Sequence, residues 1–325
     1  MLEKAIKLLF SYQKKFSNHF SNFCYRYVCN PYIKIFGKHD TRNCRYYLSL
    51  CLIFKNEGPF LKEWIDYHLS MGVDHFYLYN NNSTDDYELV LSPYIKDGSV
   101  TLIDFPYDQA QMRAYEDCYT RFKGESNWIS FLDTDEFICP KQHNDIRDWL
   151  KGYDKYPGVM INWLMFGTGG TIKHDYNKNV IEQYFHCWKY LHPYGKCILN
   201  TKWEVASFKQ WYVHHHTNMK YNIFGMKISI PVVDQFGRIH SVETDLNMNH
   251  HKKEDCQIQI NHYFTKSWDI YSKKISKSDV YFKDNPKKNI EYFYQTETRC
   301  STTDYCIYRF LIKMKLFQNI IRIPD

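Results

Sequence analysis

Between Tyr46 and Phe137 the chain alternates short apolar runs with amphipathic stretches, and this alternation restricts the possible folds more than any other feature. Each apolar run has the length of a buried strand, and the stretches between the runs repeat apolar residues at helical spacing. A succession of strand, helix and strand predicts parallel strands joined by crossover helices. We therefore predict an α/β fold with a Rossmann-like, mostly parallel sheet. The predicted strands are 47–54, 75–79, 100–105 and 128–132, and the predicted helices begin near Leu61, Tyr87 and Gln109.

The regular alternation ends after Pro140. The sequence beyond it predicts a short helix at 146–150, a strand at 159–164 and a glycine-bearing loop at 166–170. We expect this part to form a mixed half of the same domain that faces a substrate. No linker rich in Pro, Gly or Ser interrupts the chain, so we predict one domain over 46–280.

The two flanking segments, 1–45 and 281–325, are basic and amphipathic. In the first segment Lys and Arg far outnumber Asp and Glu and alternate with Leu and Phe, and residues 308–323 have a similar composition. Helices of this kind can lie on an anionic membrane surface. The alternative is that each helix packs its apolar side against the domain and exposes its charges to water.

The formal net charge is +6, and no apolar stretch is long enough to span a bilayer, so we expect at most peripheral membrane contact. The 11 cysteines show neither a CxxC pair nor regular spacing, and lysines interrupt the apolar stretch near the N-terminus. We therefore expect a cytoplasmic protein that can reach the inner face of a membrane. The sequence has no helix-turn-helix, zinc-finger or ribonucleoprotein motif, so we expect no nucleic-acid partner.

Polar loops follow three of the predicted strands, at 55–59, 80–86 and 133–136. In open parallel sheets ligands bind beyond the carboxyl ends of the strands, so these loops should converge on one crevice. The sharpest chemical signal there is Asp133 with Asp135, because residues two apart in extended backbone point the same way. Paired carboxylates in this position suit Mn²⁺ or Mg²⁺, which can neutralise a departing diphosphate. A DxD sequence also occurs in solvated loops and helix caps, and the pattern alone leaves both interpretations open.

Several ordered motifs resemble those of glycosyltransferase family 92, which is related to family 2. The matching motifs are LIFKNE at 52–57, EWIDYH at 63–68, NNNSTD at 80–85, FLDTDEF at 131–137, Trp163, FGTGG at 166–170, Lys196, HHH at 214–216 and NHYFTKS at 261–267. The likeness covers roughly residues 46–275. It implies a GT-A fold, a nucleotide-sugar donor of the UDP-sugar type, a divalent metal and an inverting reaction.

The resemblance also implies roles for individual residues. The residues implied in donor binding are Lys55, Asn56, Glu57, Asp85, Gln109, Arg113 and Lys266. The implied metal ligands are Asp133, Asp135, His262 and, from the triple-histidine run, His215. Trp163 is the candidate for stacking on the acceptor sugar. Ordinary structural roles are the alternatives: a helix cap for Asp85, a surface ion pair for Arg113, a solvated cation for Lys266 and a core position for Trp163.

An inverting transfer requires a base that accepts the proton of the acceptor hydroxyl. Nothing in the spacing selects one among the carboxylates of the second half, which are Asp175, Glu204, Asp234, Glu243 and Asp245. We predict a metal-dependent glycosyltransferase that moves a sugar from a nucleotide-sugar donor to a glycan or lipid-linked glycan. The alternatives are a metal-dependent phosphate or nucleotide hydrolase and a non-catalytic module that binds glycan or nucleotide.

Overall fold

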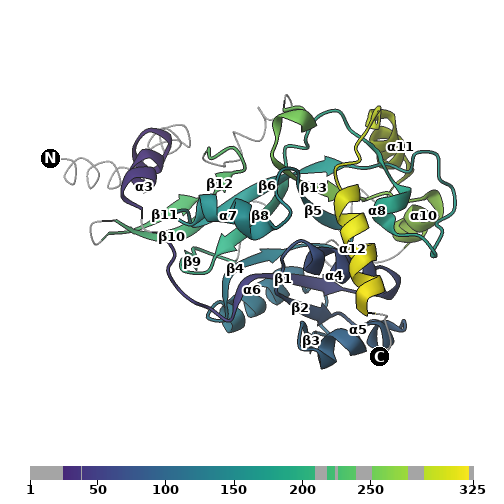
Figure 1. Ribbon diagram of the computed structural model, residues 1–325, viewed down its shortest axis with the longest axis horizontal. Coiled ribbons are helices and arrows are strands. Elements are labelled where there is room, and N and C mark those ends of the chain that lie inside the picture. The colour runs from purple at the N-terminus through teal and green to yellow at the C-terminus, as the bar shows by residue number, and fades with distance from the viewer. Residues whose placement is uncertain are drawn as a thin grey trace.

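The computed structural model describes residues 25–37, 39–208, 218–223, 226–238, 251–276 and 289–321. A nine-stranded sheet with the order β3-β2-β1-β4-β8-β6-β13-β5 runs through the molecule, and β12 pairs with β6 off this path (Figure 1). The first half of the sheet consists of the parallel strands β1 (Tyr46–Phe54), β2 (His75–Asn80), β3 (Val100–Asp104) and β4 (Ser126–Phe131). The four predicted strands and their parallel pairing are confirmed, with each end within two residues of the prediction.

The crossover helices of this half are α4 (Gly58–Ser70), α5 (Tyr87–Lys96) and α6 (Gln111–Phe122). Strand β1 separates two clusters of buried side chains, because successive residues of a strand point to opposite faces. Leu50 and Leu52 pack on the face that α4 covers, whereas Cys51 and Ile53 pack on the face of α6. This burial on both faces explains why β1 reads as an almost continuous apolar run.

The predicted stop of α4 at Gly72 is confirmed. Gly72 has φ +102°, and its N–H donates to the carbonyl of Leu69 at 3.1 Å. A left-handed residue after the last turn is the usual way to end a helix, and glycine adopts it without a steric penalty. The site has no room for a side chain either, since a Cβ there would lie 2.3 Å from Asp145 Oδ1.

The second half of the sheet is mixed, as predicted. Strand β8 is antiparallel to β4 and β6, and β13 is parallel to β6 and antiparallel to β5. Strands β6 and β13 therefore run in the same direction as β4, and their carboxyl ends lie at the same edge of the sheet. The strands of this half are β5 (Glu136–Pro140), β6 (Gly158–Met165), β8 (Gly195–Asn200), β12 (Val233–Asp234) and β13 (Ile258–His262).

Smaller elements surround the sheet. Two small sheets contain β7 (His186–Cys187), β9 (Glu204–Val205), β10 (Asn218–Ile223), β11 (Met226–Pro231) and β14 (Thr302–Thr303). The remaining helices and helical turns are η1 (Tyr25–Cys29), α3 (Asn30–Phe36), α7 (Ile146–Leu150), η2 (Lys151–Tyr153), α8 (Val180–Gln183), η4 (Lys253–Asp255), α10 (Trp268–Ser276), α11 (Ile290–Arg299) and α12 (Tyr308–Ile321). The predicted short helix at 146–150 corresponds to α7.

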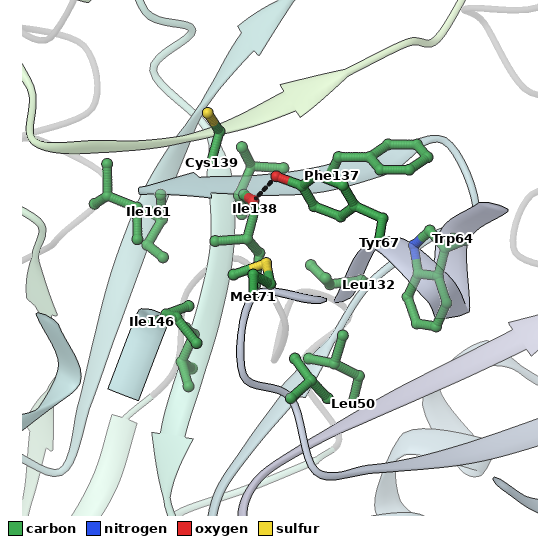
Figure 2. Close-up of a cluster of buried hydrophobic side chains, with 14 of the residues drawn as sticks. Leu50, Trp64, Tyr67, Met71, Leu132, Phe137, Ile138, Cys139, Ile146 and Ile161 are labelled. Carbon is green, nitrogen blue, oxygen red and sulfur yellow. Dashed lines mark hydrogen bonds between the residues drawn. The ribbon is translucent and has the colours of Figure 1, made fainter. Parts of the chain in front are cut away.

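Helix α4 is anchored to β5 by two buried side chains (Figure 2). Tyr67 Oη donates to the carbonyl of Ile138 at 2.6 Å, and Trp64 Nε1 donates to the carbonyl of Glu136 at 3.0 Å. The ring of Phe137, the strand residue between these two acceptors, lies 5.2 Å from that of Tyr67. Buried hydrogen-bonding groups with these partners fix the strand that begins directly after the acidic loop.

The described parts of the two flanking segments join the same core. Cys29 and Ile33, at the start of α3 and within it, belong to the main hydrophobic cluster. Helix α12 lies beside α4, and the ring of its Phe310 is 5.7 Å from that of Tyr67 (Figure 1). Among the described residues, no helix combines the length and apolar character needed to cross a bilayer. Residues 1–24 lie outside the described residues, so the predicted N-terminal arm is described only from Tyr25.

Candidate active site

The polar loops after β1 and β2 are tied together by hydrogen bonds. The backbone N–H of Asn56 donates to Ser83 Oγ at 3.0 Å, and Asn56 Oδ1 accepts from the N–H of Thr84 at 2.7 Å. The N–H of Gly58, the first of α4, donates to Asp85 Oδ2 at 2.8 Å. The loops therefore converge as predicted and form one continuous rim, in which Asp85 bonds the start of α4 and does not cap α5, the helix that its own loop leads into.

Unusual backbone conformations are concentrated at this edge of the sheet. In the part of the chain that the structure describes, the non-glycine residues with positive φ are Asn56, Asn82, Gln109 and Lys266. These residues follow β1, β2, β3 and β13 respectively, whose carboxyl ends point the same way. Such conformations cost on the order of 1–3 kcal/mol each and cluster at functional sites. The backbone thus points to the same edge as the polar loops do.

Asp133 and Asp135 follow β4 in the centre of this edge. Asp133 Oδ2 accepts from Lys196 Nζ at 2.8 Å, and Asp133 Oδ1 accepts from Gln111 Nε2 at 3.4 Å. Asp135 Oδ2 accepts from Lys274 Nζ at 2.8 Å. Each aspartate is thus bonded to a different lysine. The Asp133 side chain is 37% exposed and the Asp135 side chain is 9% exposed, so Asp133 offers the more accessible carboxylate.

Lys196 on β8 is fully buried between two carboxylates. Besides Asp133, its Nζ contacts Glu136 Oε2 at 3.3 Å, and the same oxygen accepts from the N–H of Asp133 at 3.0 Å. Burial lowers the pKa of Lys196, but Asp133 and Glu136 outweigh it and hold that pKa above its ordinary value. Burial raises the pKa of Glu136 well above its usual range, although Lys196 opposes the shift. Glu136 thus supports the loop of Asp133 from inside the protein.

His262 at the end of β13 faces Asp135, with Nε2 at 3.4 Å from Oδ1. Burial lowers the pKa of His262 despite this carboxylate, so the imidazole is neutral at pH 7. Burial raises the pKa of Asp135, but Lys274, His262 and Lys266 reverse the effect and bring it well below the usual range. A neutral imidazole beside an ionised carboxylate is the state in which both groups can bind a metal ion.

The donor set at this edge fits a divalent cation. Within the described ranges, no three or more His, Cys, Asp and Glu side chains are arranged so that they could hold a metal ion. Asp133, Asp135 and His262 supply two carboxylates and one imidazole, a set compatible with Mn²⁺. Ions of this class usually complete their coordination with substrate phosphate and water. His215, the fourth predicted ligand, lies outside the described residues.

Two further residues predicted to bind the donor face the same edge. Lys266 is buried, and its Nζ lies 4.5 Å from the ring centre of Phe60. Burial lowers the pKa of Lys266, while Asp135 and Glu57 raise it. Glu57 Oε2 accepts from Thr134 Oγ1 at 3.3 Å, which connects the rim to the loop of the two aspartates.

The start of the third crossover helix differs from the prediction. Gln109 has φ +47° and is exposed, so the helix begins at Gln111 instead, because a left-handed residue cannot continue a right-handed helix. It is the Gln111 amide that reaches Asp133. The guanidinium of Arg113 lies 4.2 Å above the ring of Tyr107, and Lys55 is exposed.

Trp163 on β6 occupies the core position named as its alternative. Its side chain is largely buried, and its ring centre lies 4.7 Å from that of His262. It therefore packs beneath the candidate metal ligand and supports the orientation of that imidazole. Stacking of Trp163 on an acceptor sugar stays a prediction.

The candidate bases in the described ranges are engaged in local contacts. Asp175 Oδ1 accepts from the N–H of Asn177 at 3.0 Å, Glu204 pairs with Lys220 at 3.2 Å, and Asp234 pairs with Arg238 at 2.8 Å. None of these contacts leads to the loop of Asp133. The other two candidates, Glu243 and Asp245, lie outside the described residues.

Sequence reasoning missed Gln111, Lys274 and Glu297. Glu297 on α11 accepts from the N–H and Oγ1 of Thr168, at 2.9 Å and 2.7 Å, and so holds the glycine-bearing loop after β6. Lys274 belongs to a helix whose lysines resemble a solvated face, and no local pattern separates it from Lys273. Only the position of α10 beside the acidic loop identifies it.

Comparisons with known proteins identify the family to which the chain belongs. The model of the family described as "Glycosyltransferase family 92" matches residues 46–305. A family 92 protein of Ricinus communis is 35% identical over 132 residues, covering 39% of this chain and 24% of the relative. A galactan β-1,4-galactosyltransferase of Arabidopsis thaliana is 29% identical over 114 residues, covering 32% of this chain and 22% of the relative.

A solved structure of S. aureus TarS residues 1–349 in complex with UDP aligns with a TM-score of 0.33 and 12% identity, over 48% of this chain and 47% of that chain. The matches to the curated family 92 relatives span only 21% to 38% of their lengths. The family model nevertheless covers most of this sequence, including both aspartates, the rim and His262. The chain belongs to glycosyltransferase family 92.

Proposed function

We propose that this chain is a metal-dependent glycosyltransferase that moves a sugar from a UDP-sugar to a glycan or lipid-linked glycan, with inversion. The observation that carries the proposal is the position of Asp133 and Asp135 beside the rim that joins the loops after β1 and β2. A nucleoside diphosphate can place its phosphates at the aspartates and its nucleoside along the rim. Hydrolysis of a simple phosphate ester would use the aspartates but would leave the rim without a role.

The chain's own residues would hold and orient the donor. Asp133, Asp135 and His262 would bind the cation, which when present stabilises negative charge on the leaving diphosphate. Lys196 fixes the Asp133 carboxylate from inside the protein, so little rearrangement is needed when the donor arrives. Lys266 places a further positive charge near Asp135, where it can attract the diphosphate.

The rim can supply the contacts that distinguish one nucleoside from another. Asn82 is exposed and Ser83 is partly exposed, so both retain hydrogen-bonding capacity toward a ligand. A site built to bond a polar group discriminates strongly against ligands that lack it. UDP-galactose is the first donor to test, since one relative is named as a galactosyltransferase.

We also propose peripheral contact with the cytoplasmic face of a membrane, through residues 1–45 and α12. Helix α12 has apolar side chains both on the side that packs against the domain and on the side that faces away from it. Phe310, Leu311 and Met314 are buried against the domain, while Ile312 and Leu316 are 60% and 58% exposed. Such an outward apolar face can contact lipid while the inner face holds the helix in place.

The function is tested with thermal shift and sugar-transfer assays on the full chain. We expect one UDP-sugar to raise the melting temperature only with Mn²⁺, because a ligand that binds only the folded state stabilises it by about 2.7 kcal/mol at a hundredfold excess over Kd. Asp133→Asn and Asp135→Asn should abolish both the shift and the transfer. Asp148→Asn is the matched control, since Asp148 is exposed and pairs only with Lys151 nearby.

The outcomes separate the candidate functions. A shift with one donor together with transfer to a glycan acceptor supports the glycosyltransferase. Metal-dependent release of phosphate from nucleotides without any acceptor would favour a hydrolase instead. A folded protein that binds no nucleotide sugar with Mn²⁺ present would contradict the proposal and favour a non-catalytic module.

A further inference from the structure

The two lysines at the acidic loop differ in how firmly they are held. Lys196 Nζ is completely buried and contacts both Asp133 and Glu136. Lys274 is 28% exposed and contacts one carboxylate, that of Asp135. Its other neighbours are the Phe264 carbonyl at 3.3 Å and the Phe264 ring, whose centre lies 3.9 Å from Nζ. One ammonium is thus enclosed by two carboxylates, and the other is paired with one.

A cation bound by both aspartates conflicts with this arrangement. Two positive charges at contact distance from the same carboxylate repel each other strongly where water is scarce. Lys196 cannot move away without breaking its buried ion pair with Glu136, and breaking a buried ion pair is costly. Lys274 can leave more readily, because its long side chain extends from α10, is partly exposed and contacts a single carboxylate. In the metal-free arrangement Lys274 therefore occupies one oxygen of the Asp135 carboxylate that the ion would bind.

We propose that Lys274 is a displaceable internal cation, which occupies Asp135 in the metal-free protein and competes with the divalent metal for that carboxylate. The proposal rests on the proposed function, because it concerns the same metal site. Lys274 keeps Asp135 paired and in place while no metal is bound. It also weakens metal binding until the donor arrives.

This competition links the metal to the donor. The ammonium displaced from Asp135 remains within reach of an anionic diphosphate at the same edge. An ion pair with the diphosphate can then replace the lost ion pair between Lys274 and Asp135. UDP should then strengthen Mn²⁺ binding more in the wild type than in a variant without this ammonium. Linkage requires that Mn²⁺ strengthens UDP binding by the same factor.

The test measures Mn²⁺ binding to the full chain from the electron paramagnetic resonance signal of the free ion, with and without UDP. The variants are Lys274→Gln, Lys274→Arg and the neighbouring Lys273→Gln, which removes an exposed charge from the same helix. Without UDP we expect Lys274→Gln to bind Mn²⁺ about tenfold more tightly than the wild type, because coupling between close charge pairs commonly reaches 1.5 kcal/mol or more. Lys274→Arg and Lys273→Gln should resemble the wild type.

Either of two results overturns the proposal: Mn²⁺ binds Lys274→Gln no more tightly than the wild type, or UDP strengthens Mn²⁺ binding equally in both proteins. Melting curves establish that the variants are folded, and the arginine variant retains the charge if the glutamine variant does not fold. In that case Lys274→Met, which also removes the ammonium, is measured in place of Lys274→Gln, with the same expected results and the same two overturning results. Sugar transfer by the wild type that survives removal of metal would contradict the proposed metal dependence itself, independently of the comparison among lysine variants.

Discussion

At the level of single residues, the sequence predicted the acidic centre better than its surroundings. Asp133 and Asp135 were placed correctly because a buried strand ends directly before them, and strand length is readable from an apolar run. Their partners come from β8 and α10, which are far away in the sequence. Lys196 appeared in the family resemblance without a role, and Lys274 has no local signal at all. Contacts across a sheet depend on strand order, which hydrophobic periodicity alone does not supply.

Lys196 provides the clearest prediction about stability at this scale. Replacing Lys196 with Met leaves Glu136 buried without its counter-charge, and breaking a buried pair in this way typically costs about 3–5 kcal/mol. We expect a loss of that order in the free energy of unfolding, measured by urea denaturation. Lys151→Met is the control, because Lys151 is 64% exposed and exposed ion pairs contribute little to stability.

The double variant Lys196→Met with Glu136→Gln separates charge from packing. If the unpaired Glu136 causes the loss, neutralising it should restore part of the stability. A double variant no more stable than Lys196→Met would show instead that the packing of the lysine side chain matters more than its charge.

At the level of elements, the helices and strands of the parallel half were predictable, and their connections to the second half were not. Helix α4 illustrates both sides. Its apolar spacing and its stop at Gly72 are visible in the sequence, whereas the hydrogen bonds from Trp64 and Tyr67 to β5 require the tertiary fold. Similarly, the start of α6 was placed two residues early, because the left-handed conformation of Gln109 is set by its loop and not by helix propensity.

Glu63 connects α4 to α8 and should make stability depend on pH. Its carboxylate accepts from the backbone N–H groups of Val180 and Ile181, at 2.7 Å and 3.0 Å. Burial raises the pKa of Glu63 to about 7, despite these hydrogen bonds. A carboxyl whose pKa is higher in the folded protein than the unfolded value of about 4.3 stabilises the fold in its protonated form, and the full contribution is present below about pH 4.3. This contribution is lost as the pH rises through about 7.

Glu63→Gln isolates this effect, because glutamine has a similar shape and does not titrate. We expect the free energy of unfolding of the wild type, relative to that of Glu63→Gln, to fall by about 3 kcal/mol between pH 4.5 and pH 8, as a shift of one pKa unit corresponds to about 1.4 kcal/mol. Denaturant titrations of both proteins over this range measure the difference. A difference that is constant with pH would contradict the raised pKa.

At the level of the whole molecule, the sequence suggested a domain with two basic flanking segments. In the structure, the described parts of these segments pack against the domain and share its hydrophobic core. Helix α12 packs on α4, and Glu297 of α11 holds the loop after β6, so the C-terminal residues support the same edge that carries the two aspartates. The amphipathic pattern of 308–323 allowed either a membrane-facing helix or a packed one. The pattern could not distinguish these two alternatives, since a membrane-facing helix and a packed helix both have an apolar stripe. In the structure, α12 has apolar residues on both sides.

The outward side of α12 therefore carries the last prediction. If it contacts lipid, Ile312→Ser with Leu316→Ser should weaken binding to phosphatidylserine-containing vesicles by roughly tenfold, because fully burying each side chain contributes about 1.5–3 kcal/mol and only part of each would enter the lipid. Vesicle sedimentation of the full chain measures the change, and Leu89→Ser is the control, since Leu89 is a comparably exposed apolar residue on α5. Equal sedimentation of the double variant and the wild type would exclude α12 as the contact. Loss of binding on deleting residues 1–24 alone would then assign the membrane contact to the N-terminal arm.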